Sequence, residues 1–380
     1  MTARYRSSAK RRALAVLVAC SVLLILPPRG SGPSAAAAGA TLVMDCKGEQ
    51  DCWPAAFAFT PNGKELFYLE RFSGEIHRFL FRGKRDRVWA TIPDVVGAGE
   101  QGALGIALDP RWHRRRGKQW VYAFITHGPS DENRIIRMRK RKKGRGTLTQ
   151  RLLSIDLDLP NTNHNGGAIH FGPDRKLYAV TGDQGQEPAR SQDLADPAGK
   201  VLRLNRDGSR PADNPVPGSL AFSFGHRNSF GFAFDPLTGD IWQSENGPNC
   251  NDEVNLILPG GNYAWGPEGA SCPSGGGDVT DTNASGPDPR RLPEVNYASV
   301  IVPTGAAFCR GCGLGLEVEG DLLVGTFGGS IHRYDLDPQR DDVAADSIMY
   351  EHPGGVLAMD RRKNGQLFFS DTTGIFRLTA

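Results

Sequence analysis

The chain has 380 residues, of which 39% are hydrophobic and 23% charged, with a formal net charge of +3. Six basic residues and no acidic ones lie in the first 40 positions, so the rest of the chain carries −3, six units below the whole. That weakly acidic remainder excludes a general electrostatic attraction to nucleic acid.

The first 40 residues have the three parts of a secretory signal. Basic residues lie between Arg4 and Arg12, an apolar stretch follows from Ala13 to Leu26, and Ala38-Gly39-Ala40 offers a cleavage site before Thr41. The apolar stretch is short for a bilayer span. We expect a secreted or extracytoplasmic protein with no transmembrane segment after cleavage. A lipoprotein anchored at Cys20 is the less favoured alternative, because the apolar run continues past this cysteine.

An internal repeat organises the remainder of the chain. An apolar strand, a small turn and a second apolar strand recur six times, and each copy precedes a third strand that often carries Arg. Repeats of short strands at this spacing are typical of a radial β architecture. We therefore predict an all-β, six-bladed β-propeller with four-stranded antiparallel blades, formed by residues 41–380 as one domain. The copies begin at Phe57, Leu104, Ala168, Gly231, Thr304 and Val356.

Six cysteines follow the signal segment. An even number of cysteines in an exported chain favours disulfides. Of the fifteen pairings that six cysteines allow, sequence proximity favours Cys46–Cys52, Cys250–Cys272 and Cys309–Cys312.

A basic run between Arg137 and Arg145 falls at a predicted hairpin. One interpretation is a solvated turn at the outer rim. The other is contact with an anionic surface, such as cell-envelope polymer or lipid headgroups.

Polar residues cluster at strand ends where a structural repeat does not need them, and three of them suit oxidation of an alcohol. His164 could take the hydroxyl proton. Asp183 could hold the ring tautomer and stabilise the imidazolium. Arg227 could stabilise negative charge on an acceptor oxygen. A hydride acceptor is also required, and the sequence has no strand-linked G-x-G-x-x-G for NAD or FAD.

From about Phe57 to Leu378 the chain resembles the soluble quinoprotein glucose and aldose dehydrogenases, the glucose/sorbosone dehydrogenase family. The resemblance implies a six-bladed propeller that uses pyrroloquinoline quinone (PQQ) and calcium to oxidise the anomeric hydroxyl of a sugar, with an external electron acceptor. It is densest in the motifs Gly182–Gly185, Gly199–Asn205, Gly225–Asn228, Gln243–Asn249 and Gly260–Trp265.

The resemblance also implies roles for individual residues. It makes His164 the base and Asp183 its supporting carboxylate. The residues it implies for the cofactor and substrate are Arg227, Asn228, Thr304 and Gln101, with Gln101 near the substrate. The residues it implies for calcium are Gly247 and Pro248, through their carbonyls, and Glu253 and Tyr263, which match a structural site in part of the family.

The chain departs from the family where cationic side chains hold the three carboxylates of PQQ. The corresponding segments, Gly325–Gly329 and Glu351–Gly355, contain no Lys or Arg, and Arg310 or His352 are the candidates to replace them. A trianion needs counter-charge or many donors. Two alternatives therefore stay open: a catalytically inactive propeller that binds a glycan or a protein, and a calcium-dependent lactonase.

The substrate contacts also depart from the family. Asn163 stands before His164 where the best-known members have Asp, and Pro188 takes the sugar-contacting position that follows Gly182–Gly185. We expect altered substrate contacts.

Overall fold

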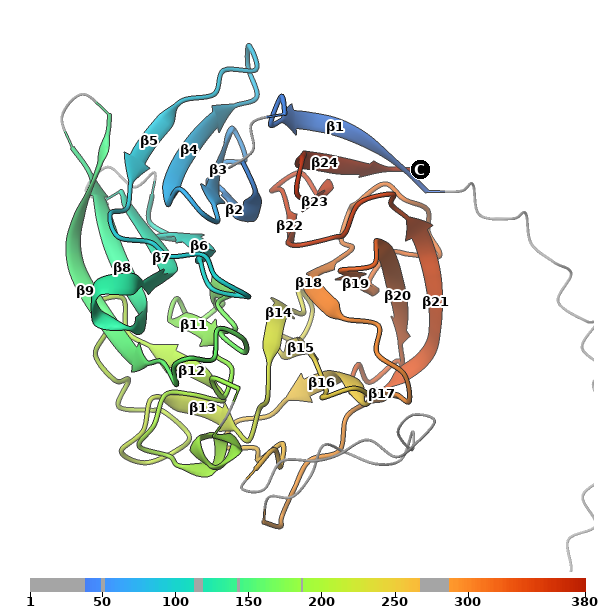
Figure 1. The fold of residues 1–380 in the computed structure, drawn as a ribbon. Coiled ribbons are helices and arrows are strands. Elements are labelled where there is room, and N and C mark those ends of the chain that lie inside the picture. The colour runs from blue at the N-terminus through green and yellow to red at the C-terminus, as the bar shows by residue number, and fades with distance from the viewer. Residues whose placement is uncertain (1–37, 49–51, 113–118, 142–143, 186, 267–286) are drawn as a thin grey trace, which may run out of the picture. The chain divides into compact units, whose positions relative to one another are not determined.

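A computed structural model of the chain describes residues 38–48, 52–112, 119–141, 144–185, 187–266 and 287–380. These residues form six four-stranded antiparallel sheets arranged in a ring (Figure 1). The predicted all-β, six-bladed propeller is therefore confirmed. The predicted signal segment, residues 1–40, falls almost entirely outside the described residues.

Blades 1 to 5 follow the order of the chain, from an inner strand to an outer one. Blade 1 comprises β2 (Pro54–Phe59), β3 (Glu65–Glu70), β4 (Glu75–Leu80) and β5 (Val88–Thr91). Blade 2 comprises β6 (Ala103–Leu108), β7 (Trp120–His127), β8 (Glu132–Lys140) and β9 (Gly146–Asp156). Blade 3 comprises β10 (Ile169–Phe171), β11 (Leu177–Val180), β12 (Lys200–Leu204) and β13 (Ala221–Phe224).

The remaining blades repeat the plan. Blade 4 comprises β14 (Ser229–Phe234), β15 (Ile241–Glu245), β16 (Asp252–Ile257) and β17 (Val295–Tyr297). Blade 5 comprises β18 (Pro303–Phe308), β19 (Leu322–Thr326), β20 (Ser330–Leu336) and β21 (Val343–Glu351). Blade 6 comprises β22 (Met359–Arg361), β23 (Leu367–Ser370), β24 (Gly374–Thr379) and β1 (Gly39–Asp45). Two 3₁₀ turns, η1 (Gly128–Ser130) and η2 (Pro188–Gln192), lie between strands.

Blade 6 closes the ring by joining the two ends of the described chain. The N-terminal strand β1 pairs antiparallel with the C-terminal strand β24, from Gly39 opposite Thr379 to Asp45 opposite Gly374 (Figure 1). This pairing covers the edge of β24 and links the two ends of the described chain within one blade.

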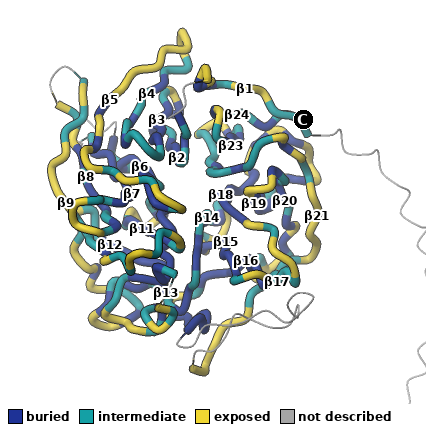
Figure 2. Tube along the Cα trace, viewed as in Figure 1, coloured by how far each residue is buried: buried dark blue, intermediate teal, exposed yellow. Residues whose placement is uncertain are grey.

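Hydrophobic layers between neighbouring blades form the core. One layer joins Phe67 and Trp89 of blade 1 to Ile106 and Val121 of blade 2. Burial is deepest along the inner and middle strands, whereas the outer strands β9 and β21 are largely exposed (Figure 2). This gradient matches the apolar first and second strands of every sequence repeat.

Two of the three predicted disulfides are present, Cys46–Cys52 and Cys309–Cys312. The predicted partner of Cys250, Cys272, lies outside the described residues.

The basic hairpin joins β8 to β9, and Arg137 places its guanidinium 4.3 Å from the centre of the Trp120 ring. Contact of this hairpin with an envelope surface stays a prediction. No helix within the described ranges has the length and hydrophobicity needed to cross a membrane.

Glycine recurs on the inner strands because adjacent blades approach most closely there. A Cβ built at Gly105 would lie 2.0 Å from the Gly167 carbonyl oxygen, and one at Gly231 would lie 2.1 Å from that of Thr304. A Cβ at Gly305 would lie 2.4 Å from the amide nitrogen of Met359. In all three strands the pairing register shifts at or beside the glycine. A β-bulge and the lack of a side chain together let the inner strands converge.

This packing predicts that Gly231→Ala destabilises the propeller by about 1–3 kcal/mol, because the methyl group would overlap backbone that cannot move away. Gly328→Ala is the matched control, since its new Cβ would meet nothing closer than 3.8 Å. Urea unfolding followed by tryptophan fluorescence gives both free energies. Equal stabilities of the two variants would contradict the close-approach explanation.

Candidate active site

The blades surround a cavity of about 580 Å³ on the ring axis. Its walls combine apolar side chains, including Trp53, Leu104, Phe230 and Phe327, with a polar set contributed by loops of several blades. Six of the residues predicted from the sequence line it: His164, Arg227, Asn228, Gly247, Pro248 and Thr304. Residues from positions 164 to 304 therefore meet in one cavity.

His164 is held by its side chain and by its backbone. Its Nδ1 lies 2.7 Å from Asp183 Oδ1. Its backbone adopts a left-handed conformation with φ of 58°, and a Cβ on Gly182 would lie 2.0 Å from its carbonyl oxygen. Within the described part of the chain, Nε2 has no hydrogen-bond partner. The ring thus offers one nitrogen to the cavity while Asp183 orients the other.

Asp183 is almost completely buried and fully hydrogen-bonded. Oδ1 also accepts a hydrogen bond of 2.6 Å from the Gly185 amide, and Oδ2 accepts one of 2.6 Å from Trp265 Nε1. These contacts fix the carboxyl group in place, and a carboxylate held in this way orients the imidazole of His164 through Nδ1. The sequence predicted the pairing with His164 but gave no sign of the contribution of Trp265.

Glu100 is a site residue that the sequence analysis missed. Its Oε2 accepts 2.7 Å and 3.1 Å hydrogen bonds from the His164 backbone amide and Asn228 Nδ2, and it lines the cavity. Its neighbour Gln101, which was the predicted residue, is buried and does not line the cavity. The only signal for Glu100 was its place in the same polar segment.

Arg227 contacts both the Asn246–Gly247 backbone and the Trp265 ring. Its Nη1 donates to the carbonyl oxygens of Asn246 and Gly247, at 2.9 Å and 2.6 Å, and its guanidinium lies 5.3 Å from the Trp265 ring centre. Burial lowers the pKa of Arg227, and the carboxylates of Asp183 and Glu100 oppose that shift. The residue remains charged, because a guanidinium keeps its proton across the physiological range.

Two buried polar atoms, one in this guanidinium and one in the next residue, have no hydrogen-bond partner among the described residues. Arg227 Nε and Asn228 Oδ1 make no hydrogen bond to any described residue. Buried polar atoms are almost always hydrogen-bonded in folded proteins. One donor and one acceptor at the cavity wall therefore indicate that the site is built for a polar ligand.

Arg71 supplies a second positive charge, which the sequence analysis also missed. It lies after β3 in blade 1 and lines the cavity. Its guanidinium lies 5.0 Å from the ring centres of both Trp53 and Phe72, and its Nε donates to the Gln101 carbonyl oxygen at 3.0 Å. Burial lowers its pKa and Glu100 partly restores it.

The segments expected to hold a cationic clamp contribute no charge to the cavity. Only Phe327 of Gly325–Gly329 reaches the lining, and Glu351–Gly355 does not. Neither Arg310 nor His352 lines it, and His352 Nε2 lies 2.9 Å from Asp371 Oδ2. The cationic side chains among the described lining residues are Arg71 and Arg227.

The Gly247–Pro248 turn lies against the carboxylate of Asp252. Asp252 Oδ1 accepts the Gly247 amide at 2.8 Å, and Oδ2 accepts those of Ile301 and Val302 at 2.6 Å and 2.8 Å. Burial raises the pKa of Asp252, and these amides oppose the shift. Gly247, Pro248 and Asp252 all line the cavity.

The other predicted residues lie apart from this turn. Glu253 is buried in β16, and Asn255 Nδ2 donates to it at 3.1 Å. The Tyr263 hydroxyl donates to the Leu256 carbonyl oxygen, and its ring stacks on His226. Thr304 Oγ1 lies 2.6 Å from the Val356 carbonyl oxygen. Neither Glu253 nor Tyr263 lines the cavity.

Of the two substrate-contact departures, Asn163 lines the cavity beside His164. Pro188 begins η2 and lies outside the lining.

Comparison with known proteins identifies the family. The sequence model described as "Glucose / Sorbosone dehydrogenase" matches residues 52–376. Because this match covers most of the chain, the protein belongs to the glucose/sorbosone dehydrogenase family, as the sequence motifs indicated.

Individual relatives agree with this assignment. Quinoprotein glucose dehydrogenase B of Acinetobacter calcoaceticus is 32% identical over 243 residues, which cover 56% of this chain and 50% of that protein. The chain thus spans about half the length of the curated relatives it matches most strongly. An oxidoreductase (glucose dehydrogenase) from Thermus thermophilus has a similar structure, with a TM-score of 0.74 and 31% identity over 90% of this chain and 100% of its own. The PQQ-bound aldose sugar dehydrogenase of Streptomyces coelicolor also has a similar structure, with a TM-score of 0.72 and 28% sequence identity. The match covers 91% of this chain and 99% of that protein.

The geometry around Asp183 predicts that Trp265→Phe costs about 1–3 kcal/mol of stability beyond the loss of ring volume, because a buried carboxylate oxygen loses its donor. Trp242→Phe is the matched control. Trp242 is also buried, but its Nε1 has no acceptor among the described residues. Unfolding free energies that fall equally in the two variants would show that the hydrogen bond to Asp183 contributes nothing.

Proposed function

We propose that the protein is an exported, PQQ- and calcium-dependent dehydrogenase that oxidises a hydroxyl group of a sugar or a related alcohol. The family assignment, the quinoprotein relative and the PQQ-bound structural neighbour support the cofactor and substrate class. The observation that carries the proposal is the His164–Asp183 pair, in which Nε2 has no partner among the described residues and the ring lines a cavity that also contains Arg227.

The lining residues fit a flat, anionic quinone. Trp53, Phe230 and Phe327 supply apolar walls, and Arg227 Nε and Asn228 Oδ1 supply an unused donor and acceptor. The expected clamp in blades 5 and 6 is missing, but Arg71 brings counter-charge from blade 1. Two guanidiniums in a partly buried cavity offer the charge-assisted hydrogen bonds that carboxylates need.

Bound PQQ would supply a two-electron acceptor for the hydride that leaves the substrate carbon. His164 would accept the hydroxyl proton at Nε2, so that the hydroxyl carbon becomes a carbonyl and the electron pair of its C–H bond departs with the hydride. Asp183 would keep Nδ1 protonated and stabilise the imidazolium that forms. Arg227 would stabilise negative charge that develops on an acceptor oxygen.

Calcium would bind at the Gly247–Pro248 turn. Backbone carbonyls and carboxylates are the ligands that hard cations prefer, and the turn offers both, with Asp252 as the carboxylate. A second calcium ion at Glu253 and Tyr263 stays a prediction of the family resemblance. Export through a cleaved signal segment and transfer of electrons to an external acceptor belong to the same proposal.

The proposal predicts that His164→Ala lowers the rate of aldose-dependent dye reduction by about 10²–10⁴-fold, the usual contribution of a general base. PQQ affinity should change little, because His164 is assigned to the substrate. Purified protein, titrated with PQQ in excess calcium and assayed with a panel of aldoses, tests both points. Saturable PQQ binding with a fully active variant would refute the role of His164. No PQQ binding by the unaltered protein would favour the glycan- or protein-binding alternative.

The charge argument makes a separate prediction for Arg71. Arg71→Met should weaken PQQ binding by about 10–100-fold, the loss expected for one charge-assisted hydrogen bond to an anion. Arg78→Met is the matched control in the same blade, since Arg78 pairs with Glu65 at 2.5 Å and does not line the cavity. Fluorescence quenching by PQQ measures both affinities, and equal values would exclude Arg71 as the counter-charge.

A further inference from the structure

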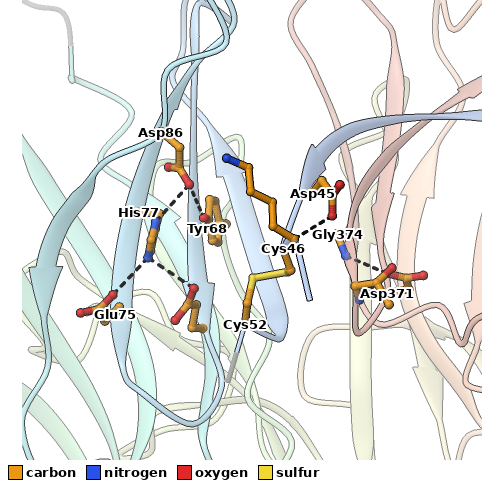
Figure 3. The surroundings of a disulfide bond; sticks show 12 residues. Asp45, Cys46, Cys52, Tyr68, Glu75, His77, Asp86, Asp371 and Gly374 are labelled. Atoms are coloured by element: carbon orange, nitrogen blue, oxygen red, sulfur yellow. Dashed lines mark hydrogen bonds and ion pairs between the residues drawn. A yellow bond between two sulfur atoms is a disulfide. The ribbon is translucent and has the colours of Figure 1, made fainter. Parts of the chain in front are cut away.

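A second cavity lies away from the ring axis, between β1 and blade 1. Its volume is about 400 Å³, and its lining includes Met44, Tyr68, Glu70, His77 and Asp86. Figure 3 shows the His77 ring between Asp86 and Glu75, beside the Cys46–Cys52 disulfide. None of these side chains takes part in the proposed dehydrogenase site.

Both nitrogens of His77 face carboxylates. Nδ1 lies 3.2 Å from Asp86 Oδ2, and Asp86 in turn accepts a 2.5 Å hydrogen bond from the Tyr68 hydroxyl. Nε2 lies 3.2 Å from Glu75 Oε2 and 3.3 Å from Glu70 Oε1. One ligand atom from each of Glu70, Glu75 and His77 lies within 4.8 Å of both others.

This arrangement contains both parts of a typical protein metal site, namely the ligand atoms and the hydrogen-bonded groups that orient them. A ligating histidine commonly donates its second nitrogen to a carboxylate, which orients the ring and raises its basicity. Asp86 occupies that position on Nδ1, and the Tyr68 hydroxyl orients Asp86. Ligands at about 2.0–2.1 Å from a tetrahedral ion lie roughly 3.3–3.4 Å apart. The separations of Nε2 from the two glutamate oxygens are close to that value.

Blade 5 contains an internal comparison. His332 occupies the corresponding position in the third strand and lies 3.2 Å from Asp346 through Nδ1. It stacks on Tyr334 of its own strand, whereas His77 stacks on Tyr68 of the neighbouring strand. Among the described ion pairs, His332 has this one carboxylate, whereas His77 has three. A His–Asp pair beside a tyrosine ring is thus present in blade 5 with one carboxylate among the described ion pairs, so such a pair does not require residues like Glu70 and Glu75 beside the imidazole.

Charge favours a cation between these groups. Three carboxylates lie within 3.3 Å of one imidazole, so the surroundings of the ring are rich in negative charge. Lys47 and Lys84 line the same cavity, and the ion pairs described for the cluster are those of His77 with Glu70, Glu75 and Asp86.

We propose that Glu70, Glu75 and the Nε2 atom of His77 bind a divalent first-row transition metal, with Zn²⁺ chemistry and with water from the cavity completing the coordination. Imidazole together with carboxylate oxygens suits such ions, whereas calcium prefers oxygen alone. Glu70 ends β3, and Glu75 and His77 lie in β4, so the ion ties the two strands of one hairpin together. The same turn carries Arg71, so the ion also steadies one wall of the central cavity.

The test uses the full chain, freed of metals with chelator and then saturated with calcium to fill oxygen-only sites. Zn²⁺ titration by calorimetry should give one site per chain, and Co²⁺ should give the visible absorption of a four- or five-coordinate ion. His77→Gln should weaken Zn²⁺ binding by at least about 100-fold, and Asp86→Asn by about 10–100-fold.

His332→Gln is the matched control and should leave Zn²⁺ affinity unchanged. Absence of stoichiometric Zn²⁺ binding, or equal binding by unaltered protein and His77→Gln, would overturn the proposal. Thermal unfolding with and without Zn²⁺ adds a second readout, since an ion bound only by the folded state raises Tm. A rise that persists in Glu70→Gln/Glu75→Gln would place the ion elsewhere and would equally refute the site.

Discussion

Closure of the ring is the constraint on which the rest of the structure depends. Pairing of β1 with β24 commits the two ends of the described chain to one sheet, and six blades then have to share a common centre. The inner strands can meet there only because Gly105, Gly231 and Gly305 let backbone contact backbone. The central cavity and its ring of loop residues follow from that convergence, since each blade delivers its loops to the same axis.

The fold could be predicted because each repeat is recognisable from a short stretch of sequence. Each copy places apolar strands on either side of a small turn, and the pattern survives even in the looser copies that begin at Thr304 and Val356. The contribution of β1 to blade 6 could not be predicted in the same way. The first strand lies far from its partner in the chain, and nothing in residues 39–45 identifies β24 as its neighbour.

The site could be predicted only in part, for a related reason. His164, Asp183 and Arg227 were recognisable because their residue types suit the chemistry and because they lie in family motifs. Glu100 and Arg71 were missed because their roles depend on contacts across the ring, such as the 2.7 Å hydrogen bond from the His164 amide to Glu100. Gln101 was chosen over its neighbour because sequence alone does not tell which of two adjacent polar residues turns toward the cavity.

The charges in the central cavity explain why its ligands should bind together. Arg227 already donates to the Gly247 carbonyl oxygen, which is one of the oxygens proposed for calcium. A carbonyl oxygen has two lone pairs and can accept both, but a guanidinium and a divalent ion in one partly buried site repel each other. The carboxylates of Asp252 and Glu100 offset only part of this repulsion. Both already accept hydrogen bonds, Asp252 from backbone amides and Glu100 from Asn228. An anionic cofactor bound in the same cavity would offset the remaining repulsion. On the proposed function, PQQ and calcium therefore favour each other's binding, and by linkage the coupling is equal in both directions.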